Sequence, residues 1–373
     1  MTQDPQHTTG SSRGTSRRRS ADTDTDLDRR LRRRGFLGVA AGTTAAALLG
    51  TATTEAAAAP AHKPGHGHHA PKKPAVPRGR LGIQLYTLRD QVQSLGFERV
   101  FEELARYDYD EVEFAGYTQG TGDISLKRLR RLLRDNGLSP VGSHVGYHAD
   151  GGDPGAYTFA TQLDKVLDDA AALGIPHVGT PASPNRYGNT VDAWKRAAEE
   201  FNTYGAAARA RGLKFYQHNH ADEFGFAEDQ PDVRLYDVLL AETDPALVYL
   251  EMDIYWAYAG QYKYSTRPDG TPAPFEPLDY VLDAPHRFPL FHVKDGEHDE
   301  TNPDGYRMVD VGDGDIDYRR FLERVGSVPG GRRRHHWIVE RDDAVDPAAN
   351  PAGSLSTARR SSGHLRSLRV HGC

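Results

Sequence analysis

The strongest constraint on this chain is a regular alternation of short apolar runs and longer amphipathic stretches that begins at Leu81. Eight short runs have the length and composition of buried strands. They are Leu81–Tyr86, Glu111–Phe114, Pro140–Val145, His177–Thr180, Leu213–His218, Val248–Met252, Leu290–Val293 and His336–Val339. Between them, apolar residues recur at the three- and four-residue spacing of helices. The predicted helices are Phe97–Tyr107, Leu126–Asn136, Phe159–Leu173, Val191–Arg211, Leu235–Glu242 and Tyr318–Val325.

Eight strands, most of them followed by a helix, predict a single (β/α)₈ TIM barrel over residues 81–373. A doubly wound open sheet is the alternative. In that fold a Gly-x-Gly-x-x-Gly turn typically follows the first strand. Here the first strand runs into Leu85-Tyr86-Thr87-Leu88-Arg89-Asp90, which has no glycine. The barrel is therefore the favoured prediction.

The first 80 residues have a different composition and predict an export segment. Residues 1–30 contain little that could form a core, so we expect them to be disordered. Arg32-Arg33-Arg34-Gly35-Phe36-Leu37 and the Ala-rich run after it resemble a twin-arginine signal, in which Arg33 and Arg34 are the recognised pair. We predict a signal region over 1–61 and a His/Pro/Lys-rich linker over 62–80. The protein would then leave the cytoplasm through the twin-arginine machinery, to the periplasm or the medium.

Charge and cysteine content exclude several classes of function. Residues 81–373 carry 32 Lys and Arg against 46 Asp and Glu, a net charge of −14. So acidic a domain argues against binding nucleic acid, which requires clustered Lys and Arg. The single cysteine, Cys373, excludes internal disulfides and a cysteine-based metal site. Since no cysteine lies near the signal region and no other apolar run is long enough, we expect no stable membrane anchor.

Polar side chains gather where the predicted strands end, which is where barrel enzymes build their sites. Strand five ends in His218-Asn219-His220, and strand six offers Glu251 and Asp253. Strand seven offers His292, Lys294 and Asp295, and strand eight offers Glu340 and Asp342. A histidine from strand five, an aspartate from six, a histidine from seven and a glutamate from eight would converge. Two imidazoles and two carboxylates suit one divalent ion, Mn²⁺, Zn²⁺, Co²⁺, Fe²⁺ or Mg²⁺, better than Ca²⁺.

Six segments at these strand ends resemble the sugar phosphate isomerase/epimerase family of xylose isomerase-like barrels. They are Ile83–Asp90, Val112–Tyr117, His218–His220, Leu250–Ala257, His292–Asp295 and Val339–Asp342. The resemblance implies a divalent metal held by four side chains, with Asp253, His292 and Glu340 as three of them. The ketose 3-epimerases of this superfamily have a glutamate as the strand-five ligand. Here His218 stands in its place, and His220 and Glu223 are the alternatives.

The chemistry that the resemblance implies is proton transfer beside a carbonyl through a metal-stabilised enediolate. Glu340 is the first candidate base, and Lys294 and His144 are candidate acids, bases or oxyanion partners. Four further residues are expected to bind a carbohydrate or cyclitol substrate: Tyr86, Glu113, His220 and Trp256.

An isomerase or epimerase is the first prediction for the activity. A lyase or dehydratase acting on keto-inositols or 3-keto-glycosides is the alternative, and a non-catalytic exported sugar-binding barrel is the second alternative. A nuclease with the same barrel would place a third-metal histidine where Trp256 stands, so we exclude it. The acidic segment Gly312-Asp313-Gly314-Asp315 is no phosphate cradle, which favours an unphosphorylated substrate.

Overall fold

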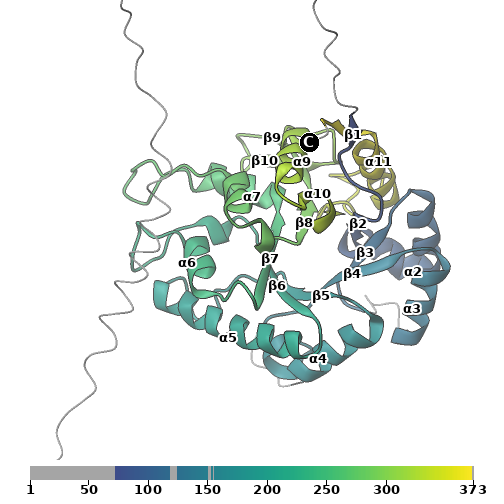
Figure 1. Ribbon diagram of the computed structural model, residues 1–373. Coiled ribbons are helices and arrows are strands. Elements are labelled where there is room, and N and C mark those ends of the chain that lie inside the picture. The colour runs from purple at the N-terminus through teal and green to yellow at the C-terminus, as the bar shows by residue number, and fades with distance from the viewer. Residues whose placement is uncertain (1–71, 118–123, 150–152, 154, 372–373) are drawn as a thin grey trace, which may run out of the picture. The chain divides into compact units, whose positions relative to one another are not determined.

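Eight parallel strands close into a barrel in the order β11-β2-β3-β4-β5-β6-β7-β8 (Figure 1). The structure, a computed structural model, describes residues 72–117, 124–149, 153 and 155–371. The barrel strands are β2 (Leu81–Gln84), β3 (Glu111–Phe114), β4 (Ser139–His144), β5 (His177–Thr180), β6 (Lys214–His218), β7 (Val248–Asp253), β8 (Leu290–Val293) and β11 (His336–Val339). The last strand closes the ring by pairing with the first, with Trp337 opposite Leu81 and Val339 opposite Ile83. The predicted TIM barrel is confirmed, and each predicted strand lies within two residues of its observed bounds.

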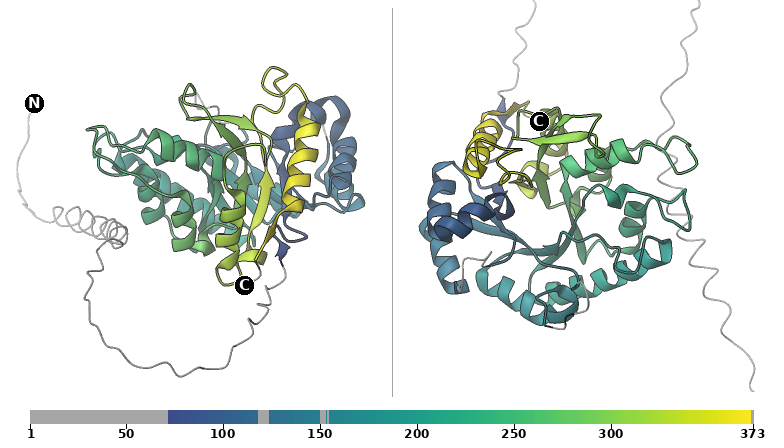
Figure 2. Two further views of the ribbon diagram at one scale, coloured as in Figure 1. Left: turned by 90° about the horizontal axis from the view of Figure 1, so that it is seen from above. Right: turned by 180° about the vertical axis from the view of Figure 1, so that it is seen from behind.

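Helices surround the strands on the outside of the barrel (Figures 1 and 2). The described α-helices are α2 (Arg89–Arg106), α3 (Leu126–Asp135), α4 (Phe159–Leu173), α5 (Val191–Ala210), α6 (Leu235–Glu242), α7 (Ile254–Lys263), α8 (Pro277–Asp283), α9 (Tyr318–Ser327), α10 (Gly331–Arg334) and α11 (Ser354–Ser367). Local chemistry sets their limits: Thr190 caps the start of α5 by accepting from the Ala193 amide, and the left-handed Gly174 ends α4.

The last helix, α11, packs beside α2 and closes the outer ring (Figure 1). The Ser354 hydroxyl at its start donates to Asp90 over 2.8 Å. One turn further along, the Ala358 carbonyl accepts from the Tyr109 hydroxyl over 2.8 Å. These two contacts join the ends of the barrel, which are distant in sequence.

Short elements complete the fold. They are the 3₁₀ helices η1 (Leu85–Leu88), η3 (Asp222–Phe224) and η4 (Pro285–Arg287), the hairpin β9 (Asp295–His298) with β10 (Tyr306–Val309), and the pair β1 (Lys73–Pro74) with β12 (Arg369–Val370). Two of them alter the expected strand ends. Tyr86 lies in η1 rather than in the first strand, because Gln84 accepts from the Tyr86 amide and turns the chain. Strand β6 ends at His218, so His220 lies in the loop that follows.

The barrel interior is apolar in the middle and polar at both ends. Its middle layer contains Val141, Tyr216, Leu290 and Ile338, all buried. At the N-terminal end, His336 contacts Glu111 over 2.8 Å. At the C-terminal end the interior side chains are carboxylates and imidazoles. Because these groups are buried above an apolar layer, little water screens the interactions between their charges.

The described residues lie in one compact unit, Gly67–Cys373. Arg33, Arg34 and the predicted signal region 1–61 lie outside the described residues, as does most of the predicted linker. Among the helices of the described part of the chain, none is both long and apolar enough to cross a membrane.

Candidate metal centre and active site

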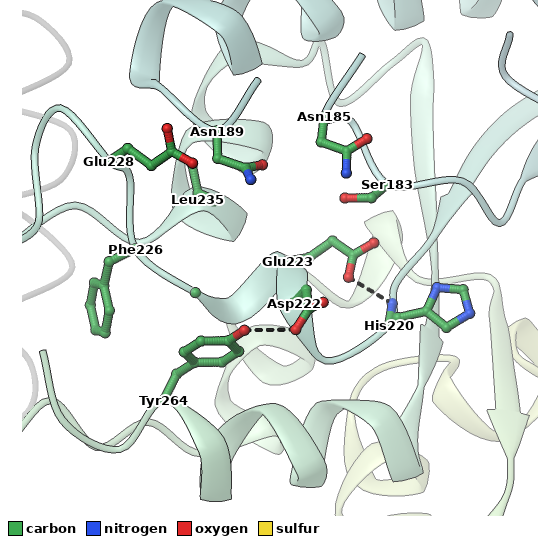
Figure 3. Close-up of a pocket in the computed structure, with 11 residues that line it drawn as sticks. Ser183, Asn185, Asn189, His220, Asp222, Glu223, Phe226, Glu228, Leu235 and Tyr264 are labelled. Atoms are coloured by element: carbon green, nitrogen blue, oxygen red, sulfur yellow. Dashed lines mark hydrogen bonds between the residues drawn. The ribbon is translucent and has the colours of Figure 1, made fainter. Parts of the chain in front are cut away.

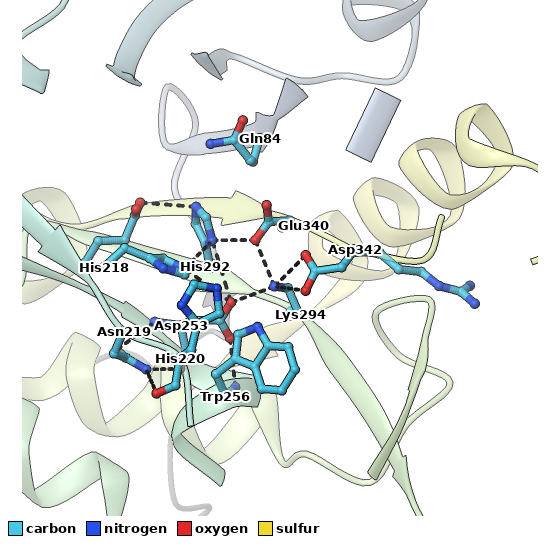
Figure 4. Close-up of polar contacts among 12 residues, drawn as sticks. Gln84, His218, Asn219, His220, Asp253, Trp256, His292, Lys294, Glu340 and Asp342 are labelled. Carbon is cyan, nitrogen blue, oxygen red and sulfur yellow. Dashed lines mark hydrogen bonds and ion pairs between the residues drawn. The ribbon is translucent and has the colours of Figure 1, made fainter. Parts of the chain in front are cut away.

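Four side chains from neighbouring strands converge at the C-terminal end of the barrel (Figure 4). They are His218 on β6, Asp253 on β7, His292 on β8 and Glu340 directly after β11. One ligand atom of each lies within 4.8 Å of the others. The ring nitrogens of His218 and His292 face one another 3.0 Å apart, and Glu340 Oε2 lies 2.7 Å from His292 Nδ1.

Asp253 contributes one carboxylate oxygen to this cluster and uses the other in the fold. Its Oδ1 accepts from the Trp256 amide over 2.9 Å and caps α7. Its Oδ2 therefore turns to the cluster, 3.4 Å from His218 Nε2 and 3.7 Å from His292 Nδ1. Since Asp253 is fully buried, its position is fixed by both the cap and the strand.

A buried carboxylate holds His292 from behind. Glu113 Oε2 lies 2.7 Å from His292 Nε2, which leaves Nδ1 directed at the cluster. Glu113 also accepts from the Tyr216 hydroxyl, and from Gln84 over 2.9 Å. A Cβ at Gly142 would lie 2.5 Å from Glu113 Oε1, so glycine there makes room for the carboxylate. This is the arrangement in which an outer carboxylate orients a metal-binding histidine.

A second group of titratable side chains adjoins the first through His292. It consists of Glu113, His144, Glu251 and His292, whose ligand atoms also lie within 4.8 Å of one another. His144 Nε2 contacts Glu251 Oε2 over 2.8 Å and lies 3.7 Å from Glu113 Oε1. Burial raises the pKa of Glu251 to about 7, and the nearby Glu113 charge adds to this. We interpret this group as the hydrogen-bonded support of the first one, because Tyr216 and Gln84 already bind Glu113.

Lys294 places its ammonium among three carboxylates. Its Nζ lies 2.9 Å from Asp253 Oδ2, 2.9 Å from Glu340 Oε2 and 2.9 Å from Asp342 Oδ1. Burial alone would lower the pKa of Lys294, but these carboxylates raise it well above its ordinary value. The reverse holds for Asp253 and Glu340: burial would raise each pKa, but Lys294 holds both well below their usual range. Both carboxylates are therefore ionised at neutral pH.

The residues present fit a divalent ion. His218 is buried, and burial together with the neighbouring His292 holds its pKa well below the ordinary value, so the ring is neutral and can ligate. Asp253 and Glu340 supply two charged oxygens, which makes two nitrogens and two oxygens in all. Such a mixed set is typical of a borderline transition metal. An ion bound here would compete with Lys294 for Asp253 Oδ2 and Glu340 Oε2.

A cavity of about 640 Å³ opens over this cluster. Its walls are formed by Tyr86, Ala115, Gly116, His144, Val145, Gly146, Tyr157, Pro181, Ala182, His218, His220, Trp256, Glu340 and Asp342. Tyr86 is 43% exposed at the mouth, and the Arg89 guanidinium lies 3.9 Å from its ring centre. Trp256 lies deeper, with Lys294 Nζ 5.5 Å from its ring centre. Aromatic walls above a polar floor suit a sugar, whose ring carries both apolar and hydroxyl-bearing faces.

The structure brings together most of the residues that the sequence singled out. His218, rather than His220 or Glu223, joins Asp253, His292 and Glu340 in the cluster. His220 lines the cavity beside Trp256, with ring centres 5.7 Å apart. Glu223 turns away, and its Oε2 accepts from the His220 amide over 2.9 Å. Tyr86, His144 and Trp256 also line the cavity.

Two of the residues predicted to act on or bind the substrate lie elsewhere than at the cavity wall. Glu113 was expected to bind substrate but lies behind His292, fully buried. Lys294 is also buried and reaches the site through Glu340 and Asp342. Asp342, which the sequence placed at the end of strand eight, lies at the cavity wall and contacts Lys294. The only sequence feature that pointed to a role for Asp342 in the site was its position two residues after Glu340.

The matching family model, described as the xylose isomerase-like TIM barrel, covers residues 101–329. The chain belongs to this family. A search of curated proteins finds no match for the chain.

Solved structures of this fold resemble the chain over most of its length. A sugar phosphate isomerase/epimerase from Parabacteroides distasonis is 22% identical, with a TM-score of 0.59 over 78% of this chain and 94% of that one. An IolI protein with a bound zinc atom is 15% identical, with a TM-score of 0.56 over 77% of this chain and 98% of that one. The probable 3-DHS dehydratase AsbF from Bacillus anthracis is 12% identical, with a TM-score of 0.54 over 77% and 98%. At these identities the likeness concerns the fold.

Proposed function

We propose that this protein is a divalent-metal-dependent sugar isomerase or epimerase of the sugar phosphate isomerase/epimerase type. One observation carries the proposal: four potential ligands converge beneath a cavity of about 640 Å³, and two of them, His218 and Glu340, also line that cavity. A group that touches both the metal and the substrate can transfer a proton at a carbon next to a coordinated carbonyl. The named isomerase/epimerase among the similar folds agrees with this choice.

His218, Asp253, His292 and Glu340 would hold the ion. When bound, the ion polarises the substrate carbonyl and stabilises the negative charge that develops on its oxygen. Glu113 keeps Nδ1 of His292 directed at the cluster by contacting its Nε2. Asp253 is fixed by capping α7. These two contacts preorganise the ligands, so less reordering is needed when the ion binds.

Glu340 is the base that takes the proton from carbon. Lys294 lies 2.9 Å from Glu340 Oε2 and keeps the carboxylate ionised, and therefore able to accept a proton. His144 also lines the cavity and contacts Glu251 over 2.8 Å, so it is the candidate group for returning the proton. Tyr86 and Trp256 stack against the sugar and exclude water from the reacting carbon.

A lyase or dehydratase remains the second candidate, and one observation favours it. The cluster's ligand on β6, the fifth strand of the barrel, is His218. The cluster therefore has no second glutamate to mirror Glu340 on the opposite face of the substrate. Proton removal from one face, followed by loss of a β-hydroxyl or β-alkoxyl, needs only one carboxylate base. The substrates would be keto-inositols or 3-keto-glycosides.

Proton exchange in D₂O separates these candidates. The protein is loaded in turn with Mn²⁺, Zn²⁺ and Co²⁺ and mixed with ketoses, inososes and 3-keto-glycosides, and the products are followed by NMR. An isomerase or epimerase incorporates deuterium and yields an isomer of equal mass apart from the label, whereas a lyase releases water or an alcohol. Saturable binding without exchange or elimination would indicate a sugar-binding protein and overturn the proposal.

We also propose that the protein is exported by the twin-arginine route to the periplasm or the medium. The support is the Arg33-Arg34 pair, followed by Gly35-Phe36-Leu37 and an Ala-rich run. This route carries folded proteins, which suits a metal enzyme without disulfides.

A further inference from the structure

A second cavity, of about 400 Å³, adjoins the active-site cavity (Figure 3). It lies between the loop after β5 and the segment around η3. Its walls are Ser183, Asn185, Asn189, His220, Asp222, Glu223, Gly225, Phe226, Glu228, Leu235 and Tyr264. His220 lines both cavities. Pro181 and Ala182 line the larger cavity and Ser183, the next residue, lines the smaller one, so the two are neighbours along one loop.

The floor of this second cavity contains a buried carboxylate with an unused oxygen. Glu223 is fully buried, and its Oε2 accepts from the His220 amide over 2.9 Å. Its Oε1 has no hydrogen-bond partner within the described residues and points toward the cavity beside Ser183 (Figure 3). A buried acceptor without a partner costs roughly 1–3 kcal/mol, so a ligand that donates to it would bind favourably.

The surrounding groups are those that recognise neutral hydroxyls. Ser183, Asn185 and Asn189 supply one hydroxyl and two amides, each able to donate and accept. Lys263 and Tyr264 both donate to Oδ1 of the neighbouring Asp222, over 2.8 and 2.6 Å. The Lys263 ammonium balances the Asp222 charge and would repel a cation bound between Asp222 and Glu223. A hydroxylated ring, which donates to Glu223 and exchanges hydrogen bonds with the amides, matches the cavity better than a cation.

We propose that this second cavity is a subsite for a second sugar ring, so that the substrate is a disaccharide or glycoside whose reacting ring occupies the larger cavity. The inference rests on the proposed function, since the larger cavity must bind the reacting sugar. The linkage between the rings passes His220, the wall that the cavities share. The hydroxyls of the second ring donate to Glu223 Oε1 and contact Asn185 and Asn189.

The test compares a ketose with the same ketose carrying an additional glucosyl ring. Binding of fructose, maltulose (4-O-linked) and isomaltulose (6-O-linked) to the full-length protein with Mn²⁺ is measured by isothermal titration calorimetry. The readout is the ratio of the fructose Kd to that of the better disaccharide. At pH 8, above the pKa of Glu223 of about 7, we expect a ratio of about tenfold or more, the contribution of one hydrogen bond to a charged group. Equal affinities for all three sugars would overturn the proposal.

Three variants locate the effect. Glu223→Gln removes the charge of the free acceptor and should reduce the ratio to about threefold, the contribution of a neutral hydrogen bond. Glu228→Gln is the matched control, since it removes an exposed carboxylate from the same cavity and should keep most of the preference. Asn185→Ala, at an exposed position, should lower the ratio about threefold. An equal loss in Glu223→Gln and Glu228→Gln, or Ca²⁺ binding that depends on Glu223, would refute a sugar subsite.

Binding and turnover fail separately in this design. A disaccharide preference that depends on Glu223, without deuterium exchange, would support the subsite and contradict the proposed reaction. Exchange into fructose without any disaccharide preference would support the reaction and contradict the subsite.

Discussion

Lys294 offers the sharpest test of the charge balance in the metal centre. Its ammonium lies 2.9 Å from carboxylate oxygens of Asp253, Glu340 and Asp342, and it is 1% exposed. Lys294→Met keeps an unbranched side chain, one atom shorter than that of lysine, and removes the charge. With chelator present, the three carboxylates then lose their ammonium. Burial would lower the pKa of His292, but Glu251 and Glu340 raise it well above its ordinary value, so His292 is the cation that remains beside Glu340 and Asp253. Breaking a buried ion pair from one side typically costs about 3–5 kcal/mol.

This cost converts into a melting temperature. A domain of about 300 residues unfolds with an entropy of roughly 0.6 kcal/mol per kelvin, so 3–5 kcal/mol lowers Tm by about 5–8 °C. Added Mn²⁺ or Zn²⁺ should restore most of this loss. The ion replaces the missing positive charge and no longer competes with Lys294 for Asp253 Oδ2 and Glu340 Oε2. The metal-induced rise in Tm is therefore larger in the variant than in the wild type.

The assay is thermal unfolding followed by circular dichroism, with EDTA and with each metal. Lys263→Met is the matched control, because Lys263 also pairs with two carboxylates but its side chain is 33% exposed. Exposed pairs contribute about 1 kcal/mol or less, so this control should shift Tm by at most about 2 °C. Equal Tm values for Lys294→Met and Lys263→Met in EDTA would contradict the proposed role of Lys294 in the charge balance. An equal rise in Tm on adding metal to Lys294→Met and to the wild type would also contradict it.

Three further changes have defined outcomes. Glu340→Gln should slow deuterium exchange by about 10²–10⁴, measured by NMR; a loss below threefold would remove Glu340 as the base. Arg33→Lys with Arg34→Lys should leave an uncleaved precursor in the cytoplasm, measured by fractionation and immunoblot; normal secretion would contradict the signal. Burial raises the pKa of Glu223 to about 7, so the folded protein binds that proton more tightly than the unfolded chain, and stability falls as pH rises from about 4.5 to 7. Glu223→Gln should remove up to about 3 kcal/mol of this dependence in urea titrations; an unchanged slope would refute it.

The strands were predictable from sequence because each is a short apolar run with a clear boundary. Helix α11 was missed for a physical reason. The residues that it buries include Ser354, Thr357, Ser361 and Ser362, which are small and polar, so no apolar periodicity marks the helix. Helix α7 begins directly after β7, and Asp253 is both the last residue of the strand and the N-cap of the helix. Because no loop separates the two elements, the sequence shows no boundary between them.

The four members of the cluster were predictable because parallel strands end at one edge of a barrel. Which of His218, His220 and Glu223 joins the cluster could not be predicted, because this depends on where β6 ends and on the turn η3. That turn directs Glu223 back to the His220 amide. The second cavity was also missed, since Ser183 and Asn185 lie in a loop whose sequence has no periodic pattern. The fourth predicted strand, β5 in the structure, ends at Thr180 and is followed by Pro181, and neither residue carries a titratable group.

The distribution of carboxylates between the cluster and the cavity limits the chemistry further. Asp253 belongs to the cluster but is fully buried beneath it, so among the four candidate ligands Glu340 is the only carboxylate at the cavity wall. Asp342 also lines the cavity, but both of its oxygens face Lys294, at 2.9 and 3.0 Å. The cavity wall also contains imidazoles, and burial together with Lys294 lowers the pKa of His220 to about 4, so that ring is neutral at pH 7. With Glu340 as the proposed base, no other candidate ligand at the wall supplies a carboxylate that could return the proton. The proposed function is therefore best served by proton transfer on a single face, and His144 is the candidate group if a second face is used.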